Sequence, residues 1–327
     1  MPRSATCILS AYTLDGTGSG QRLKDEDEIT EKLRSEDLAW VHLERDHPKT
    51  REWLTKNVSY LDPIILDALL ADETRPRLLE FETGVMMILR GVNLNENEDP
   101  EDMVSIRVWI DEHRIISLRR RKLKAAQDIA ERVEAGKGPK NAGDFSVMLT
   151  SVLFDRMAPV LTDLDQRTDD AEEEVIETPD ASLRAKITDI RKQAILFRRY
   201  IAPQRDVLSM LRVSDQKWLA QTHRRYLQEN GDRLLRYVED LDAVRERAAV
   251  IKDELANILS DRLNKNMYLL SIIAAIFLPL GFLTGLLGIN VGGIPGSDNP
   301  DAFYIFSGIL TALVLVQVIL FRKLRWF

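Results

Sequence analysis

Cysteine is nearly absent from this 327-residue sequence, in which Cys7 is the only one. A single thiol excludes a disulfide within the chain, and a free thiol fits a reducing compartment for most of the chain. The first residues contain no long apolar run, so we expect no secretory signal peptide. The net charge of −7 argues against a nucleic-acid binder, because such proteins carry basic surfaces.

Enzyme motifs are missing as well. The sequence has no Walker A loop, no glycine-rich dinucleotide turn and no Gly-x-Ser-x-Gly elbow. Neither span described below contains an acid or base that could relay protons. The histidines do not pair with one another or with Cys7 at the spacing of zinc ligands; they are His42, His47, His113 and His223. We therefore expect no enzymatic activity, no bound cofactor and no tetrahedral Cys/His zinc site.

Charge is missing from two long apolar runs near the end of the chain, Met267–Leu287 and Phe303–Phe321. Each has the length of about 20 residues that a helix needs to cross the hydrocarbon core. One such run can also be a buried core helix. Two runs joined by a short loop of Gly, Pro, Asn and Asp favour a transmembrane hairpin, so membrane insertion would use these C-terminal spans.

The charges that flank the two spans predict their orientation. Lys and Arg precede the first span and follow the second, at Arg262, Lys265, Arg322, Lys323 and Arg325. The loop 288–302 contains neither residue type, and its only carboxylates are Asp298 and Asp301. The excess of Lys and Arg on cytoplasmic loops therefore places both termini in the cytoplasm and the loop outside.

A long helix is predicted before and through the first span. Residues 215–287 contain Pro279 as their only proline, and apolar or small residues recur there in steps of three and four. This is the heptad pattern of a coiled coil or a long helix, as opposed to several shorter helices. Its members are Leu234, Tyr237, Leu241, Val244, Ala248, Ile251, Leu255 and Ile258.

If this stripe continues into the membrane, it predicts which residues line an axis between copies of the chain. Two spans cannot enclose a pore, so a transporter of this kind must form an oligomer. The predicted lining is Asn264, Met267, Ser271, Ala274, Leu278, either Gly281 or Phe282, and Gly285. In a symmetric bundle each residue becomes a ring, and rings of carboxamides and freed carbonyls suit a hydrated cation. Pro279 bends the span or frees a carbonyl, and the glycines allow close helix packing.

The residues before the spans predict a cytoplasmic domain. Strand-like and helix-like patterns alternate over residues 1–120, with strands at 39–44, 78–82, 85–93, 103–110 and 114–118 and helices near 27–35, 49–57 and 64–71. This pattern indicates an α/β domain with mixed or largely antiparallel pairing. We expect a helical region over 121–266, with helices near 144–176 and 181–211 before the long stalk helix, and a transmembrane hairpin with a basic tail over 267–327.

An acidic cluster occupies the end of one predicted helix, and it includes Asp169, Asp170 and Glu173. A solvated charged face is its ordinary explanation. A cytoplasmic metal sensor, or a surface that attracts cations, is the alternative.

The run from Asn264 to Asn290 resembles the pore helix of the CorA-type metal ion transporters. That superfamily ends its first span with Gly-Met-Asn, and this chain has Gly288-Ile289-Asn290 followed by the sequence VGGIPG. The Gly-Ile-Asn variant with a Gly-Gly-Ile-Pro loop is similar to the zinc-transporting branch known as ZntB. The resemblance in architecture extends over the whole chain.

The resemblance implies a CorA-like pentameric funnel in the inner membrane, with five copies of the first span around one pore. It implies that Asn290 presents a ring of carboxamides to the hydrated ion and that Gly288 allows the tight geometry of the mouth. Asn264, Met267, Leu270, Ala274 and Leu278 match the family's pore lining. The family's usual Met-Pro-Glu-Leu loop is missing, which puts magnesium selectivity in doubt.

Three functions follow as hypotheses. The first is a transporter of Zn²⁺, with Cd²⁺ and Ni²⁺ as further ions, which the proton gradient could drive. The second is a magnesium or cobalt channel of the same architecture, because a neutral mouth suits a hydrated hard ion. The third is a membrane-anchored scaffold or metal sensor without transport, which the long helical pattern alone permits.

Overall fold

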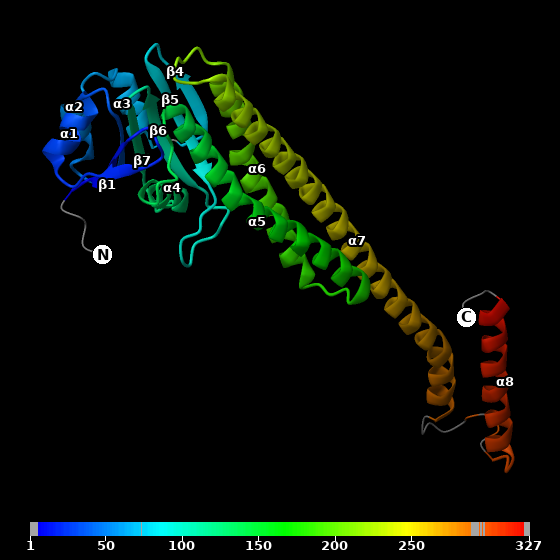
Figure 1. The fold of residues 1–327 in the computed structure, drawn as a ribbon. Coiled ribbons are helices and arrows are strands. Elements are labelled where there is room, and N and C mark those ends of the chain that lie inside the picture. Colours follow the sequence, from blue (N-terminus) through cyan, green and yellow to red (C-terminus); the bar gives the residue numbers. More distant parts are fainter. Residues whose placement is uncertain (1–5, 73, 289–293, 295, 297, 324–327) are drawn as a thin grey trace. The chain divides into compact units, whose positions relative to one another are not determined.

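The computed structural model describes residues 6–72, 74–288, 294, 296 and 298–323 (Figure 1). The chain divides between Asp253 and Glu254 into two compact units, which are described separately. The predicted boundaries after residues 120 and 266 stay predictions.

The first unit contains a seven-stranded sheet with the strand order β2-β1-β3-β7-β6-β5-β4. Only β3 and β7 pair in parallel, and every other neighbouring pair is antiparallel. The strands are β1 Ile8–Leu14, β2 Gly20–Arg22, β3 Leu38–Glu44, β4 Arg77–Glu80, β5 Gly84–Gly91, β6 Val104–Asp111 and β7 Arg114–Arg119. The five predicted strands and their largely antiparallel pairing are confirmed, whereas β1 and β2 were not predicted.

Helices cover both faces of the sheet, so its central strands are buried on each side. On one face lie α1 Glu26–Arg34, α2 Thr50–Asn57 and α3 Pro63–Leu70, at positions close to the predicted ones (Figure 1). Asp25 caps α1 and Asp62 caps α3 through backbone N–H groups of their first turns. The apolar residues of these helices share one core with Val41, Met86 and Trp109 of the sheet.

The other face of the sheet carries α4 Lys124–Glu134 and the start of α5 Ala142–Glu177. Phe145 of α5 packs edge-on against Trp40 of β3, with ring centroids 5.2 Å apart. This contact explains why an apolar run of α5 is buried although α5 is long and apolar enough to cross a membrane. Burial against the sheet thus assigns α5 to the folded first unit.

Beyond the sheet, α5 continues as one of three long helices, with α6 Leu183–Val213 and α7 Gln221–Gly288. The prediction of one continuous helix for the last of these is confirmed. The heptad stripe is buried within the chain at Leu234, Leu241, Val244, Ala248 and Ile251. It therefore contributes to packing inside one copy, and the stripe does not need a second chain to cover it.

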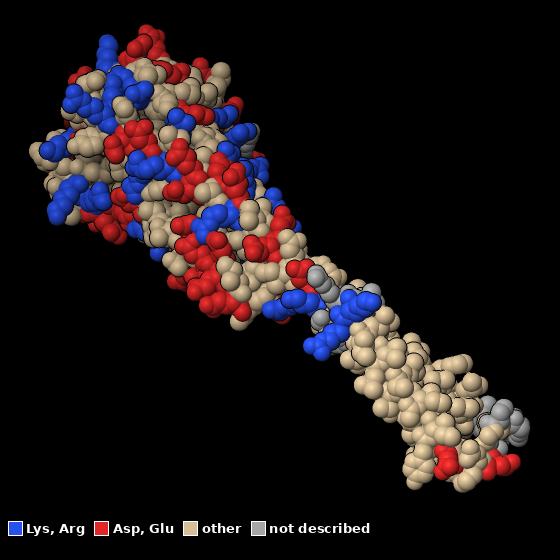
Figure 2. Space-filling model, turned by 90° about the vertical axis from the view of Figure 1, so that its right-hand side faces the viewer, with Lys and Arg blue, Asp and Glu red and all other residues tan. Residues whose placement is uncertain are grey.

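Ion pairs join α7 to its two neighbours. Arg233 contacts Asp155 of α5 at 2.6 Å, and Arg198 of α6 contacts Asp242 at 2.7 Å. Charges of both signs are interspersed over the first unit (Figure 2). The stripe and these ion pairs together hold this part of α7 on the α5 and α6 helices.

Candidate functional site

The second unit contains the end of α7 and α8 Ala302–Lys323. Both helices are long and apolar enough to cross a membrane, and almost none of their apolar surface is buried inside the chain. Figure 2 shows this surface as a stretch without Asp, Glu, Lys or Arg, with Lys and Arg gathered at one end of it. The two predicted spans are therefore present as helices with lipid-compatible surfaces.

One face of the α7 span packs against α8. Ile272 is only 6% exposed, and Ala275, Ile276 and Leu283 are half-buried. The side chain of Gln317 on α8 donates from Nε2 to the carbonyl oxygen of Ala275 at 3.3 Å. This face is therefore occupied within one copy of the chain.

The Gln317 side chain contacts α7 at a carbonyl whose hydrogen bond within the helix is missing. Pro279 lies inside α7 and has no N–H, so it cannot donate to the carbonyl four residues earlier, which is that of Ala275. An unpaired carbonyl in hydrocarbon costs free energy, and neighbouring helices commonly supply the missing donor. Gln317 supplies it here. Sequence reasoning missed this residue, although a carboxamide within an apolar span was a signal.

The predicted pore lining lies on other parts of the α7 surface. Met267 is 63% and Leu278 70% exposed, and a Cβ at Gly281 would have open space around it. Asn264, Leu270, Ser271 and Gly285 are also exposed, and Ala274 is half-buried. The hydroxyl of Ser271 donates to the carbonyl of Met267 at 2.8 Å, within its own helix. The role of these residues stays a prediction.

The predicted lining does not follow from the heptad stripe when the stripe is extended along an ideal helix. A helix advances about 100° per residue, so Met267 lies about 160° and Leu278 about 180° around α7 from Ile251. On an ideal helix the heptad stripe and the predicted lining therefore fall on opposite sides, so the heptad pattern alone does not predict this lining. A strict heptad drifts relative to a straight helix, and it does not fix a face over this distance.

The outer mouth is described only in part. Gly288 is the last residue of α7, while Ile289 and Asn290 lie outside the described residues. Asp298 and Asp301 are exposed, and Asp301 directly precedes the first turn of α8. A carboxylate at that position is favourable because helix N-termini carry partial positive charge.

The acidic cluster on α5 is largely engaged with arginine. Arg247 of α7 contacts Asp169 at 2.5 Å, Glu172 at 2.7 Å and Asp165 at 3.4 Å. The hydrogen bonds that Arg247 donates to Glu172 and Asp169 raise the pKa of its guanidinium. Asp170 accepts from Gln166 of the same helix. Among the residues that the structure describes, no three His, Cys, Asp or Glu side chains of one copy group as metal ligands, and a metal-binding role of Asp169, Asp170 and Glu173 stays a prediction.

Two of the four histidines, His42 and His223, are buried in the first unit. His42 is buried on β3 and its Nδ1 lies 2.8 Å from Ser117 Oγ. Burial lowers its pKa to about 3, with the nearby charge of Arg119 adding to the effect. His223 lies 3.0 Å from Asp144 at the start of α5. Both have the contacts of structural residues.

Comparison with known proteins places this arrangement in a family. The family model described as "CorA-like Mg2+ transporter protein" matches residues 35–323. The match covers strands β3 to β7 of the sheet, the long helices and both spans. This chain belongs to the CorA-like Mg²⁺ transporter family.

Relatives within the CorA-like family match along almost the whole chain. A Pseudomonas aeruginosa protein named divalent cation transporter CmaX is 39% identical over 322 residues, which cover 98% of this chain and 96% of the relative. A Pectobacterium atrosepticum protein named zinc transport protein ZntB is 36% identical over 316 residues, which cover 97% of this chain and 95% of the relative.

Solved structures agree with the CorA-like fold. The structure of full-length CmaX matches with a TM-score of 0.85 at 38% identity and covers 100% of both chains. The complete CorA magnesium transporter of Methanocaldococcus jannaschii matches with a TM-score of 0.80 at 18% identity, covering 99% of this chain and 100% of the other. The second likeness establishes the fold alone.

Proposed function

We propose that this CorA-family chain is an inner-membrane divalent-cation transporter whose main ion is zinc, and that it acts as a homopentamer with a central pore. The single observation that carries the proposal is the end-to-end similarity to proteins named for zinc and divalent-cation transport. The Gly-Ile-Asn sequence at 288–290 supports the zinc branch. Cadmium and nickel are further ions of this proposal.

The geometry of α7 supports a pore between copies. One face of its span is occupied by α8, while the predicted lining is left exposed and mostly apolar. Such a surface is covered either by lipid or by the same helix of other copies. Five copies would turn Asn264 and Asn290 into carboxamide rings at the two ends of an apolar path, and neutral oxygen donors suit an ion that keeps its water. Both termini would lie in the cytoplasm.

Ion flux into proteoliposomes tests the proposal. The full chain is reconstituted, and uptake of Zn²⁺, Cd²⁺, Ni²⁺, Co²⁺ and Mg²⁺ is measured with and without a pH gradient. We expect zinc uptake, with an increase when a proton gradient is imposed if transport is proton-coupled. Absence of zinc flux from folded, reconstituted protein would remove the zinc assignment.

A matched pair of asparagines tests the pore face. Asn264 and Asn266 are two residues apart on one helix, so their side chains point about 160° apart around it. We expect Asn264→Ala to change zinc flux and Asn266→Ala to leave it close to wild type. Equal effects of the two substitutions would contradict the proposed lining.

The magnesium or cobalt channel remains the second candidate, because the family description names Mg²⁺. Robust magnesium flux without zinc flux in the same liposomes would favour it. A scaffold or sensor without transport predicts that Asn290→Ala leaves metal uptake unchanged, whereas a pore predicts a change.

A further inference from the structure

A cavity of about 210 Å³ lies beside the end of α3, where arginines from several strands and loops meet. Arg90 of β5 and Arg107 of β6 both line it, and their strands are hydrogen-bonded neighbours. Residue 90 lies opposite residue 105 and residue 107 opposite residue 88. Directly opposed residues of an antiparallel pair share a face, so both arginines project from the same face of the sheet.

The structure gives neither arginine a carboxylate partner among the residues that it describes. Arg107 is only 1% exposed, and its guanidinium donates to the carbonyl oxygen of Ala71 at 2.9 Å. Its Nε–H has no acceptor among the described residues. Arg90 donates to the carbonyl oxygens of Thr74 and Met103 and lies 3.9 Å from the ring centroid of Tyr200. Neither forms an ion pair with a carboxylate of the described residues, although buried cations are normally paired.

Other arginines at the cavity already have partners. Arg120 contacts Asp46 at 2.9 Å, and Arg121 contacts Glu98 at 3.2 Å. Asp72, which also lines the cavity, pairs with Arg45 at 2.6 Å. These pairs neutralise each other, so Arg90, which is half-buried, and the buried Arg107 are the arginines of the cavity without an ion-pair partner in the described part of the chain; two further carboxylates, Glu101 and Asp102, also line it.

A structural role explains part of the arrangement. The carbonyl of Ala71 ends α3, and a cation at a helix C-terminus stabilises it. A carbonyl dipole compensates a full charge only partly, and burial accordingly lowers the pKa of Arg107 to about 10, with repulsion from Arg45 adding to the effect. Burial likewise lowers the pKa of Arg90. After α3 is capped, positive charge on the arginines is therefore still uncompensated, and a bound anion would lower its electrostatic free energy.

A buried carboxylate of the cavity restricts which anion fits. Glu101 lines the cavity, is only 6% exposed and has no side-chain hydrogen bond or ion pair within the described part of the chain. An ionised carboxylate only accepts hydrogen bonds, so it repels a fully deprotonated oxyanion and favours one that carries an O–H donor. Hydrogen phosphate has such a donor at neutral pH and sulfate does not.

We propose that this cavity is a cytoplasmic phosphate site, in which Arg90 and Arg107 bind the oxyanion and Glu101 accepts a hydrogen bond from its remaining O–H group. The planar fork of guanidinium donors matches two oxygens of a phosphate group. The site lies in the folded first unit and is independent of the proposed ion path. Its natural occupant is inorganic phosphate; a nucleotide phosphate ester mostly lacks the proton at neutral pH, because its second pKa is about 6.

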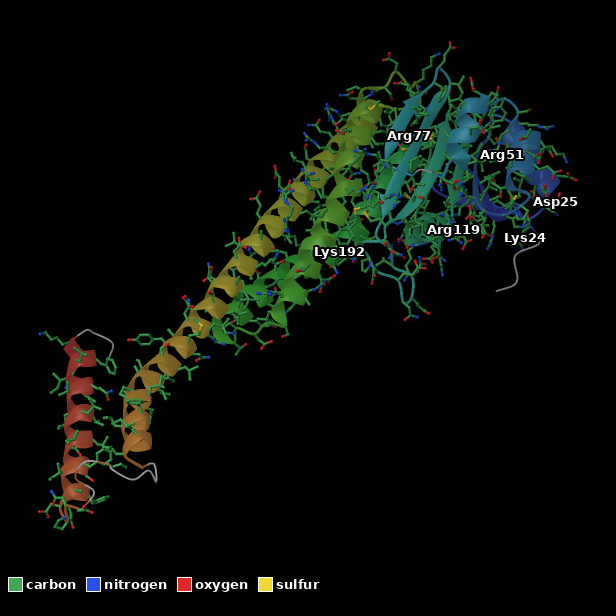
Figure 3. The ribbon with its side chains drawn as sticks, turned by 180° about the vertical axis from the view of Figure 1, so that it is seen from behind. Lys24, Asp25, Arg51, Arg77, Arg119 and Lys192 are labelled. Atoms are coloured by element: carbon green, nitrogen blue, oxygen red, sulfur yellow. The ribbon has the colours of Figure 1, made fainter. Side chains whose placement is uncertain are left out.

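Calorimetric titration of the full chain in detergent, in metal-free buffer, tests the site with sodium phosphate as the probe. We expect phosphate to bind with a Kd below about 1 mM and sulfate to bind at least about tenfold more weakly. Arg107→Gln should weaken phosphate binding by at least about tenfold, because a charge-assisted hydrogen bond is lost. The control is Arg51→Gln (Figure 3). Arg51 is an exposed residue of α2 that pairs with Asp67 of α3, and its substitution should leave the Kd for phosphate unchanged.

Glu101→Gln keeps the test decisive if Arg107→Gln does not fold. An amide can donate as well as accept, so this variant should lose the preference for phosphate over sulfate. Absence of phosphate binding to folded wild-type protein would overturn the proposal. Equal affinity for sulfate and phosphate would overturn the role of Glu101. Competition by ADP that is stronger than that of phosphate would overturn inorganic phosphate as the occupant and assign the site to nucleotides.

Discussion

The hydrogen bond between Gln317 and the carbonyl of Ala275 gives a prediction that a double-mutant cycle can measure. Gln317→Leu removes the donor from α8, and Pro279→Ala restores an N–H within α7 that can reach the same carbonyl. In the wild-type background the carbonyl then has no donor. In the P279A background the helix itself supplies one, so the loss of Gln317 should cost less.

The coupling free energy is the quantity to predict, because the single effect of Gln317→Leu contains opposing terms. The substitution loses a hydrogen bond, but it also removes Gln317 Oε1, which is buried without a partner among the described residues. The second term is common to both backgrounds and cancels in the cycle. Hydrogen bonds between transmembrane helices have coupling energies that average about 0.6 kcal/mol and reach about 1.7 kcal/mol. We expect a coupling free energy of about 1 kcal/mol, because the Ala275 carbonyl has no donor within its own helix.

Reversible unfolding in mixed micelles of the four proteins provides the measurement. Thr311→Val is the matched control, since the exposed Thr311 donates its hydroxyl to the carbonyl of Ser307 within α8. It should show no coupling with Pro279→Ala. A Gln317 coupling no larger than that of Thr311, within about 0.3 kcal/mol, would refute the assignment.

Three further predictions concern the first unit. The pKa of His42 is about 3 in the folded chain and about 6.5 in the unfolded chain, so protons bind preferentially to the unfolded state. The free energy of unfolding should therefore be highest above about pH 6.5 and fall by roughly 2 kcal/mol between pH 7 and 5. His42→Gln should abolish this fall in pH-dependent melts. Leu234→Ala should cost about 2–5 kcal/mol in denaturant unfolding, because this stripe residue is fully buried; a loss under about 1 kcal/mol would contradict its place in the core. Arg247→Gln should cost at most about 1 kcal/mol, and less at high salt, because its three carboxylate partners are exposed; an unchanged loss in 1 M salt would exclude an ionic origin.

Much of the sheet was predictable because its strands carry their own signals. β5 and β6 are rich in apolar residues, and short turns separate β4 from β5 and β6 from β7, which pair as antiparallel neighbours. β2 has the sequence Gly-Gln-Arg and contains no apolar residue, so nothing local marks it as a strand. It becomes one because Arg22 pairs with Tyr12 of β1, a contact that only the folded chain defines.

The candidate sites, like the sheet, could be predicted from the sequence only in part. Helical periodicity predicts which residues of α7 share a face, but it does not identify the neighbour of each face. The donor to Ala275 comes from a residue 42 positions away, and the carbonyl at Arg107 comes from 36 positions away. In the sequence, Arg107 is merely a charged residue within an apolar strand. Its burial without a carboxylate partner depends on tertiary structure.

The parallel pairing of β3 with β7 has a consequence for the order of folding. About 70 residues separate the end of β3 at Glu44 from the start of β7 at Arg114, and the strands β4 to β6 lie between them in the chain. During synthesis, β1 to β3 emerge first, and the central edge of β3 has no partner until β7 has left the ribosome. At about 5–20 residues per second this interval lasts several seconds. The β4–β7 meander can form from local contacts, whereas joining the two halves of the sheet requires closure of a long loop and is therefore expected late.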